Sequence, residues 1–362
     1  MRSALLPIAP DVAPESRIDF TTGMQVKPVA HLLIDVASAR GRKLLKGALS
    51  YIRRNTNWQV HAIEPGVRSV ASLGPCRKGG FGVIAQIDDA TLAAALRDCQ
   101  APVVNVGSWE ATSDIPRVGN DVRETADLAL EHFCKMGYRH VAFIGAKESP
   151  TSRELSEQFA ACALRRDVDC RTYQTDIAPT AGSYAKLIEQ LRNFPKPIGV
   201  LAGSAQLGRK LIRSCMSEGI VVPHQVAVVG FSDSTLLCEL ADPPMTSVAP
   251  HTARVGYVAA NILDRMLQGE TEIPQSTRIR PQGVAARKST DAYAVDDPDV
   301  AAAARFIREN ALSGIKVTDV LKAVPMSRRV LESRFRDYLG RTPHQEILNV
   351  RLDYVKHMLQ ET

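Results

Sequence analysis

The chain of 362 residues is long enough for two or three domains, each with a sizeable hydrophobic core. Hydrophobic residues make up 45% of it and charged residues 23%, a balance that excludes an intrinsically disordered protein. The net charge of +6 at pH 7 permits a polyanionic partner such as DNA without requiring one.

Cysteine content and apolar runs bear on location. The seven cysteines are an odd number and form no CxxC pair, so we expect reduced thiols in a cytoplasmic protein. The N-terminal apolar run is shorter than that of a signal peptide, and no later stretch offers the roughly 18 apolar residues that a membrane helix needs. We therefore predict no membrane association, and a flexible tail over residues 1–28.

From residue 29 onward, short apolar runs alternate with segments of helical period, which is typical of βαβ units and parallel sheets. The predicted strands cover 29–36, 58–63, 82–87, 102–107, 140–145, 197–202 and 225–231, and the predicted helices include 42–54, 124–136 and 206–219. These strands and helices are too many for one compact open sheet. We predict an α/β fold with two lobes, each built on a parallel sheet.

Polar residues follow the predicted strands, at the sheet edge where α/β proteins bind ligands. The set comprises Asp35, Ser38, Arg40, Arg42, Asp88, Ser108, Trp109, Asn120, Asp121, Glu148, Arg153, Ser204, Gln206, Ser232 and Asp233. Carboxylates and arginines can hydrogen-bond the hydroxyls of a sugar-like molecule, and a tryptophan can stack on its ring. The alternative for any single member is a helix cap or a solvated loop side chain, which is the commoner case.

Catalytic and cofactor motifs are weakly supported. The glycine-rich stretch 74–82 lacks the GK[ST] ending of a phosphate-binding loop, and we interpret it as a plain loop. The histidines form no HExxH pair and no zinc spacing with cysteine, and no GxSxG elbow is present. We predict no metal, no cofactor and no enzyme activity.

A polar, acidic segment ends near residue 297, after which the pattern is purely helical. We place a linker at 290–297. Asp297 and Pro298 can start a helix that ends near Gly314. A short helix is predicted at 317–323, and Ser327 can cap a third helix over 328–339 that Gly340 ends. The T-x-x-Q pattern from Thr342 to Gln345 is a capping box for a fourth helix.

The third of these helices separates its residues into two faces. Val330, Leu331, Arg334, Phe335 and Tyr338 form the predicted packing face, where Arg334 can make a phosphate contact or an internal ion pair. Two helices joined by a tight turn match a helix-turn-helix, in which the second helix enters the major groove. The predicted DNA-contacting residues are Ser327, Arg328, Arg329, Glu332, Ser333 and Arg336. The alternative is a solvated basic face on a helical bundle.

Two family resemblances extend these predictions. Residues 324–359 resemble the first helix-turn-helix and following helix of AraC/XylS-type regulators, on the pattern Ser327, Leu331, Phe335, Gly340 and the RTPH run 341–344. Residues 118–145, 219–231 and 245–270 resemble the sensor of LacI/GalR-type repressors, a fold shared with periplasmic sugar-binding proteins. Here the sensor precedes the DNA-binding part. This order is similar to that of the bacterial xylose operon regulators, and the resemblance covers about residues 29–362.

The resemblance implies a two-lobed sensor over 29–289, with chain crossings near Asn120, Ser247 and Pro281, and a DNA-binding domain over 298–362. It implies an effector between the lobes, a pentose such as xylose, together with operator DNA and a homodimer. It also implies a second helix-turn-helix beyond the one present, so we expect a truncated DNA-binding part. The residues expected to bind the effector are Asp35, Arg42, Trp109, Asp121, Arg153, Ser204, Ser232 and Asp233.

Two positions depart from the family pattern. Ser204 and Ser232 stand where many relatives carry aspartate, which removes carboxylates that would hold sugar hydroxyls. The effector can therefore differ from xylose or bind weakly. Two other functions stay open: a solute-sensing module whose helical part only dimerises, and, ranked last, an α/β enzyme that acts on a sugar.

Overall fold

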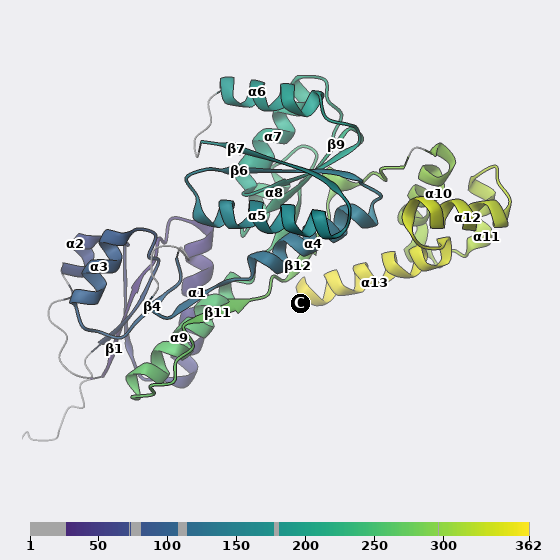
Figure 1. Ribbon diagram of the computed structural model, residues 1–362. Coiled ribbons are helices and arrows are strands. Elements are labelled where there is room, and N and C mark those ends of the chain that lie inside the picture. The colour runs from purple at the N-terminus through teal and green to yellow at the C-terminus, as the bar shows by residue number, and fades with distance from the viewer. Residues whose placement is uncertain are drawn as a thin grey trace, which may run out of the picture.

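Two α/β lobes and a group of four α-helices make up the molecule, as the computed structural model shows (Figure 1). The structure describes residues 27–71, 73, 81–107, 114–176, 181–295 and 297–361. Each lobe is built on one six-stranded sheet. The predicted two-lobed α/β architecture with a helical C-terminal part is confirmed.

Lobe 1 contains the sheet β11-β5-β4-β3-β1-β2, in which all neighbours pair in parallel. Its strands are β1 (Val29–Leu33), β2 (Gln59–Ile63), β3 (Phe81–Ala85), β4 (Val103–Asn105), β5 (Arg117–Asn120) and β11 (Ser276–Ile279). Its helices are α1 (Ala39–Asn55), α2 (Val67–Ala71), α3 (Ala90–Asp98) and α9 (Thr252–Leu267). The central strands β1 and β3 are almost wholly buried, as expected for a parallel sheet covered on both faces.

Lobe 2 contains the sheet β12-β10-β9-β8-β6-β7, parallel except for its edge strand β12. Its strands are β6 (His140–Ala146), β7 (Asp169–Thr175), β8 (Ile198–Ala202), β9 (Val226–Phe231), β10 (Thr246–Ala249) and β12 (Gly283–Ala285). Its helices are α4 (Val122–Lys135), α5 (Pro150–Arg165), α6 (Ala181–Arg192), α7 (Ala205–Ser217), α8 (Thr235–Glu239) and the 3-10 turn η1 (Lys288–Thr290).

The chain crosses between the lobes three times. It leaves lobe 1 after β5 at Asn120, returns after β10 at Ala249, and leaves again between β11 and β12. The first and third crossings lie where they were predicted, and the second lies slightly later than Ser247. The returning helix α9 packs tightly on α1 because two glycines permit it. A Cβ at Gly47 would lie 1.8 Å from the carbonyl oxygen of Ala253, and one at Gly256 would lie 2.0 Å from that of Leu44.

All seven predicted strands are present, but β5, β7, β10, β11 and β12 were not predicted. The reason is their length and position. Four of them have three or four residues, and β7 is an edge strand whose polar sequence DCRTYQT has four of its seven residues exposed. Such segments lack the apolar run by which buried strands are recognised.

The helical part comprises α10 (Pro298–Asn310), the 3-10 turn η2 (Ala311–Ser313), α11 (Val317–Ala323), α12 (Arg328–Leu339) and α13 (Pro343–Glu361). Gly314 and Gly340 have positive φ angles of 80° and 67° and end η2 and α12, as predicted. These helices share their own hydrophobic cluster.

The packing face of α12 is rotated from the predicted one. Leu331, Phe335 and Leu339 are 0%, 0% and 6% exposed, whereas Val330 and Tyr338 are 38% and 37% exposed. The buried stripe has the spacing i, i+4, i+8, which is narrower than the predicted arc, and on this side α12 packs against α10 and α13.

Candidate functional site

One cluster of charged and polar side chains joins the two lobes. We call Arg40, Lys43, Asp233 and Thr252 the interlobe cluster. Lys43 Nζ on α1 of lobe 1 lies 3.8 Å from Asp233 Oδ1, which follows β9 of lobe 2. Thr252 begins α9 at the second crossing. The cluster therefore gathers residues from both lobes and from a segment that connects them.

Several polar atoms of this cluster are buried without a hydrogen-bond partner. They are Arg40 Nε, Asp233 Oδ1 and Thr252 Oγ1. Arg40 is held in place by its Nη2, which donates to the carbonyl oxygen of Val106 at 2.8 Å. A buried polar atom without a partner costs about 1–3 kcal/mol, so three together favour a site where a polar ligand supplies the missing partners.

Burial changes the acidity of Asp233, whose side chain is 13% exposed. Its desolvation raises the pKa of the carboxyl group above the ordinary value, and the nearby Thr252, Lys43 and Arg40 oppose this only in part. The carboxylate is therefore an under-stabilised acceptor. A ligand hydroxyl that donates to it would relieve part of that cost.

Two further buried polar atoms make no hydrogen bond, Asn120 Oδ1 at the end of β5 and Ser152 Oγ in the first turn of α5. A second ion pair between the lobes connects Arg278 Nη1 of β11 to Glu154 Oε1 of α5 at 3.1 Å. Both lobes thus present polar groups at the carboxyl ends of their strands, where α/β sheets bind ligands.

The predicted effector residues hold different positions in this geometry. Asp233 belongs to the interlobe cluster. Asp121 and Ser204 cap α4 and α7 by accepting from the backbone N–H of Glu124 and Leu207. Ser232 Oγ accepts from the backbone N–H of Ser234 at 2.9 Å. The structure therefore gives three of the predicted residues a local structural role.

The remaining predicted effector residues lie away from the cluster or outside the described part. Asp35 Oδ1 accepts from the backbone N–H of Ala37 in the turn before α1. Arg42 is exposed and donates to the carbonyl oxygen of Val36 at 3.1 Å. Arg153 is exposed on α5. Trp109 lies outside the described residues.

Lys43 and Thr252 were not predicted, although Arg40 and Asn120 were in the wider set of polar residues. A signal for both existed in the sequence. Lys43 is three residues after Arg40, so the two share one face at the start of a helix. Thr252 follows a predicted chain crossing, where both lobes are within reach.

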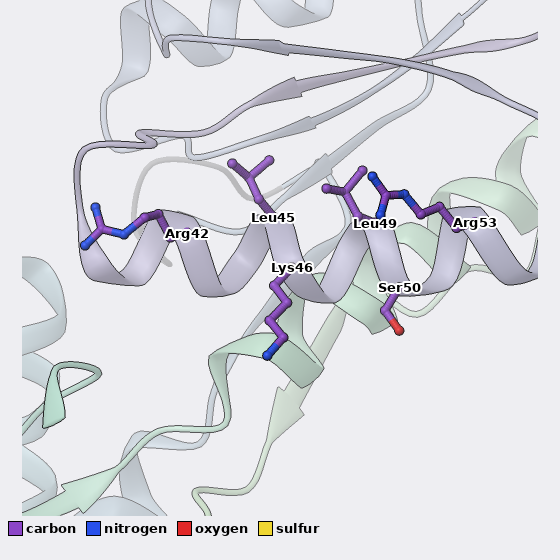
Figure 2. Close-up of a pocket in the computed structure, with 6 residues that line it drawn as sticks. All are labelled: Arg42, Leu45, Lys46, Leu49, Ser50 and Arg53. Atoms are coloured by element: carbon purple, nitrogen blue, oxygen red, sulfur yellow. The ribbon is translucent and has the colours of Figure 1, made fainter.

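A separate pocket of about 460 Å³ lies on the outward face of α1 and is open to solvent (Figure 2). Of the predicted residues it contains only Arg42. Its lining residues are Arg42, Leu45, Lys46, Leu49, Ser50 and Arg53, which include three cations and no acid. All belong to a single helix, so this pocket lies outside the interlobe cluster.

The candidate DNA-contacting helix α12 has the predicted bounds, and Ser327 caps it by accepting from the backbone N–H of Val330. Arg328 Nε pairs with Glu332 Oε1 at 2.8 Å. Arg329, Ser333 and Arg336 are exposed at the spacing i, i+4, i+7, which aligns them on one face. Among the described side chains, none forms an ion pair with Arg329 or Arg336.

Arg334 makes the internal ion pair that was one of its two predicted roles. Its Nη1 lies 2.8 Å from Asp297 Oδ2, while Asp297 Oδ1 caps α10 by accepting from the backbone N–H groups of Asp299 and Val300. Asp297 thus joins α12 to the start of α10 and fixes the angle between these helices.

Comparison with known proteins agrees with this arrangement. The family profile for a periplasmic binding protein-like domain matches residues 130–290. The structure titled transcriptional regulator CelR–cellobiose complex superposes with a TM-score of 0.59 at 21% identity, over 72% of this chain and 84% of that one, and shows the same sensor fold. The family profile and this structural match show a sensor with the periplasmic-binding-protein-like fold.

The relatives that match nearly the whole chain are more specific. The xylose operon regulatory protein of Escherichia coli (strain K12) is 30% identical over 342 residues, which cover 91% of this chain and 87% of that protein. The corresponding Haemophilus influenzae protein is 27% identical over 91% of this chain and 88% of its own length. The structure of the xylose-binding transcription activator XylR is 29% identical, with a TM-score of 0.65 over 91% of this chain and 87% of that one.

The chain belongs to the family of the xylose operon regulatory proteins. It is a ligand-responsive transcription regulator, in agreement with the prediction that it is not an enzyme. A match that extends through the helical part disfavours the hypothesis that these helices only dimerise. Among the helices of the described residues, none is long and apolar enough to cross a membrane.

Proposed function

We propose that a pentose such as xylose binds between the lobes at the interlobe cluster and changes the affinity of the protein for operator DNA. The observation that carries this proposal is the set of buried polar atoms Arg40 Nε, Asp233 Oδ1 and Thr252 Oγ1, which come from both lobes and a crossing and make no close hydrogen bond, Asp233 having only the long 3.8 Å ion pair with Lys43. Support also comes from the related structure titled as a xylose-binding activator.

The chemistry of these groups suits vicinal hydroxyls. The carboxylate of Asp233 accepts from hydroxyl groups, Arg40 Nε donates to hydroxyl oxygens, and the Thr252 hydroxyl can do either. A sugar that contacts Arg40 in lobe 1 and Asp233 in lobe 2 is bound more tightly when the lobes are close together. It therefore shifts the equilibrium towards the closed arrangement by its difference in affinity for the two states.

The proposal keeps Asp35, Arg42, Asp121, Arg153, Ser204 and Ser232 as predicted effector residues in addition to the interlobe cluster. Ser204 and Ser232 carry hydroxyls where the family resemblance implies carboxylates. Each change removes a strong acceptor, which favours a small, uncharged sugar that Asp233 and Arg40 suffice to orient.

For DNA recognition we propose that α11 and α12 form an AraC-type helix-turn-helix, with α12 in the major groove. Arg329 and Arg336 project from one exposed face, where arginine can bind guanine O6 and N7 or a phosphate. Arg328 and Glu332 form an ion pair, and we place both side chains together in the major groove. Ser333 can contact either a base or a phosphate.

We also propose the domain boundaries 29–289 and 298–362, a cytoplasmic location and a homodimer. Two copies related by a twofold axis would present two α12 helices to successive half-sites of an operator. Engaging both half-sites at once would raise the affinity well above that of one helix.

A thermal-shift panel of pentoses, hexoses and their phosphates tests the effector assignment. A sugar at 100 times its Kd should stabilise the folded protein by roughly 2.7 kcal/mol, on the order of several degrees. We expect the largest shift with D-xylose or a closely related pentose. If a hexose phosphate gave the largest shift, the pentose assignment would be wrong, and if no compound shifted the transition, the sugar assignment would fail.

A further inference from the structure

The helical part is held against lobe 2 by a hydrogen bond from Arg341. Arg341, which precedes α13, donates from Nη2 to the backbone carbonyl oxygen of Lys135 at the end of α4, at 2.6 Å. The same guanidinium pairs through Nε with Glu346 of α13. Tyr293, in the segment that follows lobe 2, donates from its hydroxyl to the other oxygen of Glu346 at 2.6 Å. We call Arg341, Glu346 and Tyr293 the docking triad.

The docking triad is well shielded from water. Glu346 is 3% exposed as a residue, and the Arg341 side chain is 13% exposed. A charged pair at such low exposure persists only when its geometry and its remaining hydrogen bonds are satisfied. Here Lys135 and Tyr293 supply those bonds, and both belong to the lobe 2 side of the junction.

Two further contacts fix the same junction. Arg308 of α10 pairs with Asp291 at 2.9 Å, and its Nη1 lies 3.4 Å from Met136 Sδ. The end of α12 also lies near lobe 2, because a Cβ added to Gly137, two residues after α4, would lie 3.4 Å from Leu339 Cδ2.

The segment predicted as a linker is itself bound to lobe 2. The backbone N–H of Ala294 donates to the carbonyl oxygen of Met136 at 2.8 Å. Thr290 is fully buried, and its hydroxyl lies 2.9 Å from His132 Nε2 and 2.8 Å from Thr246 Oγ1. The described residues of this segment are thus bound to lobe 2. These contacts restrict movement of the helical part relative to lobe 2.

Helix α4 connects this junction to the lobe crossing. It begins directly after Asn120, where its cap Asp121 donates its backbone N–H to the carbonyl oxygen of Ile279 at 2.7 Å, and it ends at Lys135. Fourteen residues of α-helix span about 21 Å. One rigid helix thus extends from the point where the lobes pivot to the point where the DNA-contacting part is docked.

We infer that Arg341 is a positioning residue, which locks α12 to the end of α4 so that movement of lobe 2 carries the DNA-contacting helix as one rigid body. Arg341 need not touch DNA or sugar for this role. The docking itself does not depend on the proposed function. Only its use in a sugar response rests on that proposal.

Hydrogen-exchange mass spectrometry on the full chain, without sugar or DNA, tests the docking. Arg341→Ala should accelerate exchange roughly tenfold or more in the segments 134–138 and 289–295, because it removes charge-assisted hydrogen bonds from the junction. The milder Tyr293→Phe, which removes one hydroxyl, should accelerate the same segments to a smaller extent. Unchanged exchange in both variants would overturn the inference.

The matched control is Arg351→Ala. Arg351 lies on α13 and, like Arg341, donates to backbone carbonyl oxygens. Its acceptors are those of Ala311 at 2.8 Å and Ile315 at 3.1 Å, and both lie within the helical part. Its loss should accelerate exchange near residues 311–315 and leave 134–138 as in the wild type. If Arg351→Ala loosened 134–138 as much as Arg341→Ala does, the effect would be general destabilisation and the positioning role would be wrong.

A second measurement separates positioning from the proposed function. Fluorescence anisotropy with a duplex selected by the protein from a random pool gives the ratio of DNA affinities with and without D-xylose. Arg341→Ala should still bind the duplex but lose most of the wild-type ratio, and an unchanged ratio would overturn the positioning role. A wild type without any sugar effect would overturn the proposed effector, while the exchange experiment alone would decide the docking.

Discussion

Replacing Asp233 by asparagine should have opposite effects on sugar binding and on stability. Asp233→Asn keeps the shape of the side chain and removes the carboxylate that we place on the sugar hydroxyls. A hydrogen bond to a charged group is worth about 1.5–3 kcal/mol, so the Kd for the sugar should rise roughly 10- to 150-fold. The sugar-free protein, by contrast, should melt at a higher temperature than the wild type.

The gain in stability follows from the raised pKa of the Asp233 carboxyl group, whose main cause is burial. An acid with a raised folded-state pKa makes the ionised folded state less stable at neutral pH. That cost is fully present above the folded-state pKa and disappears as the pH falls below it, so the difference in melting temperature should shrink in acid. The ion pair with Lys43 that is lost is long, 3.8 Å, and the Lys43 side chain is 40% exposed, so the pair offsets little of the gain.

Titration calorimetry with D-xylose and a thermal melt across pH measure the two effects. Asp114→Asn is the control, because Asp114 is an exposed carboxylate whose pKa is lowered by Arg97. It should not raise the melting temperature, and it should leave sugar binding unchanged. Asp233→Asn with wild-type affinity, or with a lower melting temperature than the wild type at neutral pH, would refute the account of the interlobe cluster.

Three further outcomes are expected. Arg336→Ala should weaken binding to all DNA sequences and reduce the slope of log K against log salt by about one unit, and a preserved slope would remove Arg336 from the phosphate backbone. Phe335→Ala should cost the helical part about 3–5 kcal/mol in a urea melt, since Phe335 is fully buried, and the control Tyr338→Ala should cost much less. Burial, reinforced by two nearby cations, lowers the pKa of His132 to about 3 from 6.5, so stability should fall by up to about 1.4 kcal/mol per pH unit as the pH drops below 6.5. His132→Gln should flatten that pH dependence, and an equally steep profile in the variant would assign it to other groups.

The helical part could be predicted from the sequence almost to the residue because its signals are local. Ser327 caps α12, Gly340 ends it with a positive φ, and Thr342 and Gln345 hydrogen-bond each other's backbone N–H groups at the start of α13. Each of these depends on residues within one helical turn. The orientation of α12 was less predictable, since it depends on how closely α10 and α13 approach.

The interlobe cluster could be predicted only in part because its contacts are distant in sequence. The Lys43–Asp233 pair joins residues from two different lobes, and no periodicity connects them. The position of Arg42 at the start of α1 was predicted, but its side chain folds back onto the carbonyl oxygen of Val36. Asp121 and Ser204 show why polar residues after strands are ambiguous, because helix capping explains each of them equally well.

The docking triad had no signal in the sequence alone. Tyr293 lies in a polar segment that was predicted to be a linker, and Glu346 is in the first turn of a helix where acidic residues are common. Their burial arises only when α13 meets the end of α4. The junction is thus a property of the assembled molecule.

The central claim is that a sugar bound between the lobes controls DNA binding. The most direct test is the affinity of the full chain for a duplex selected from a random pool, measured by fluorescence anisotropy with and without D-xylose. We predict that saturating sugar changes this affinity by roughly 5- to 150-fold, the usual range of coupling between two sites, and that Asp233→Asn requires much more sugar for the same change. An affinity that stays the same at every sugar concentration would contradict the account.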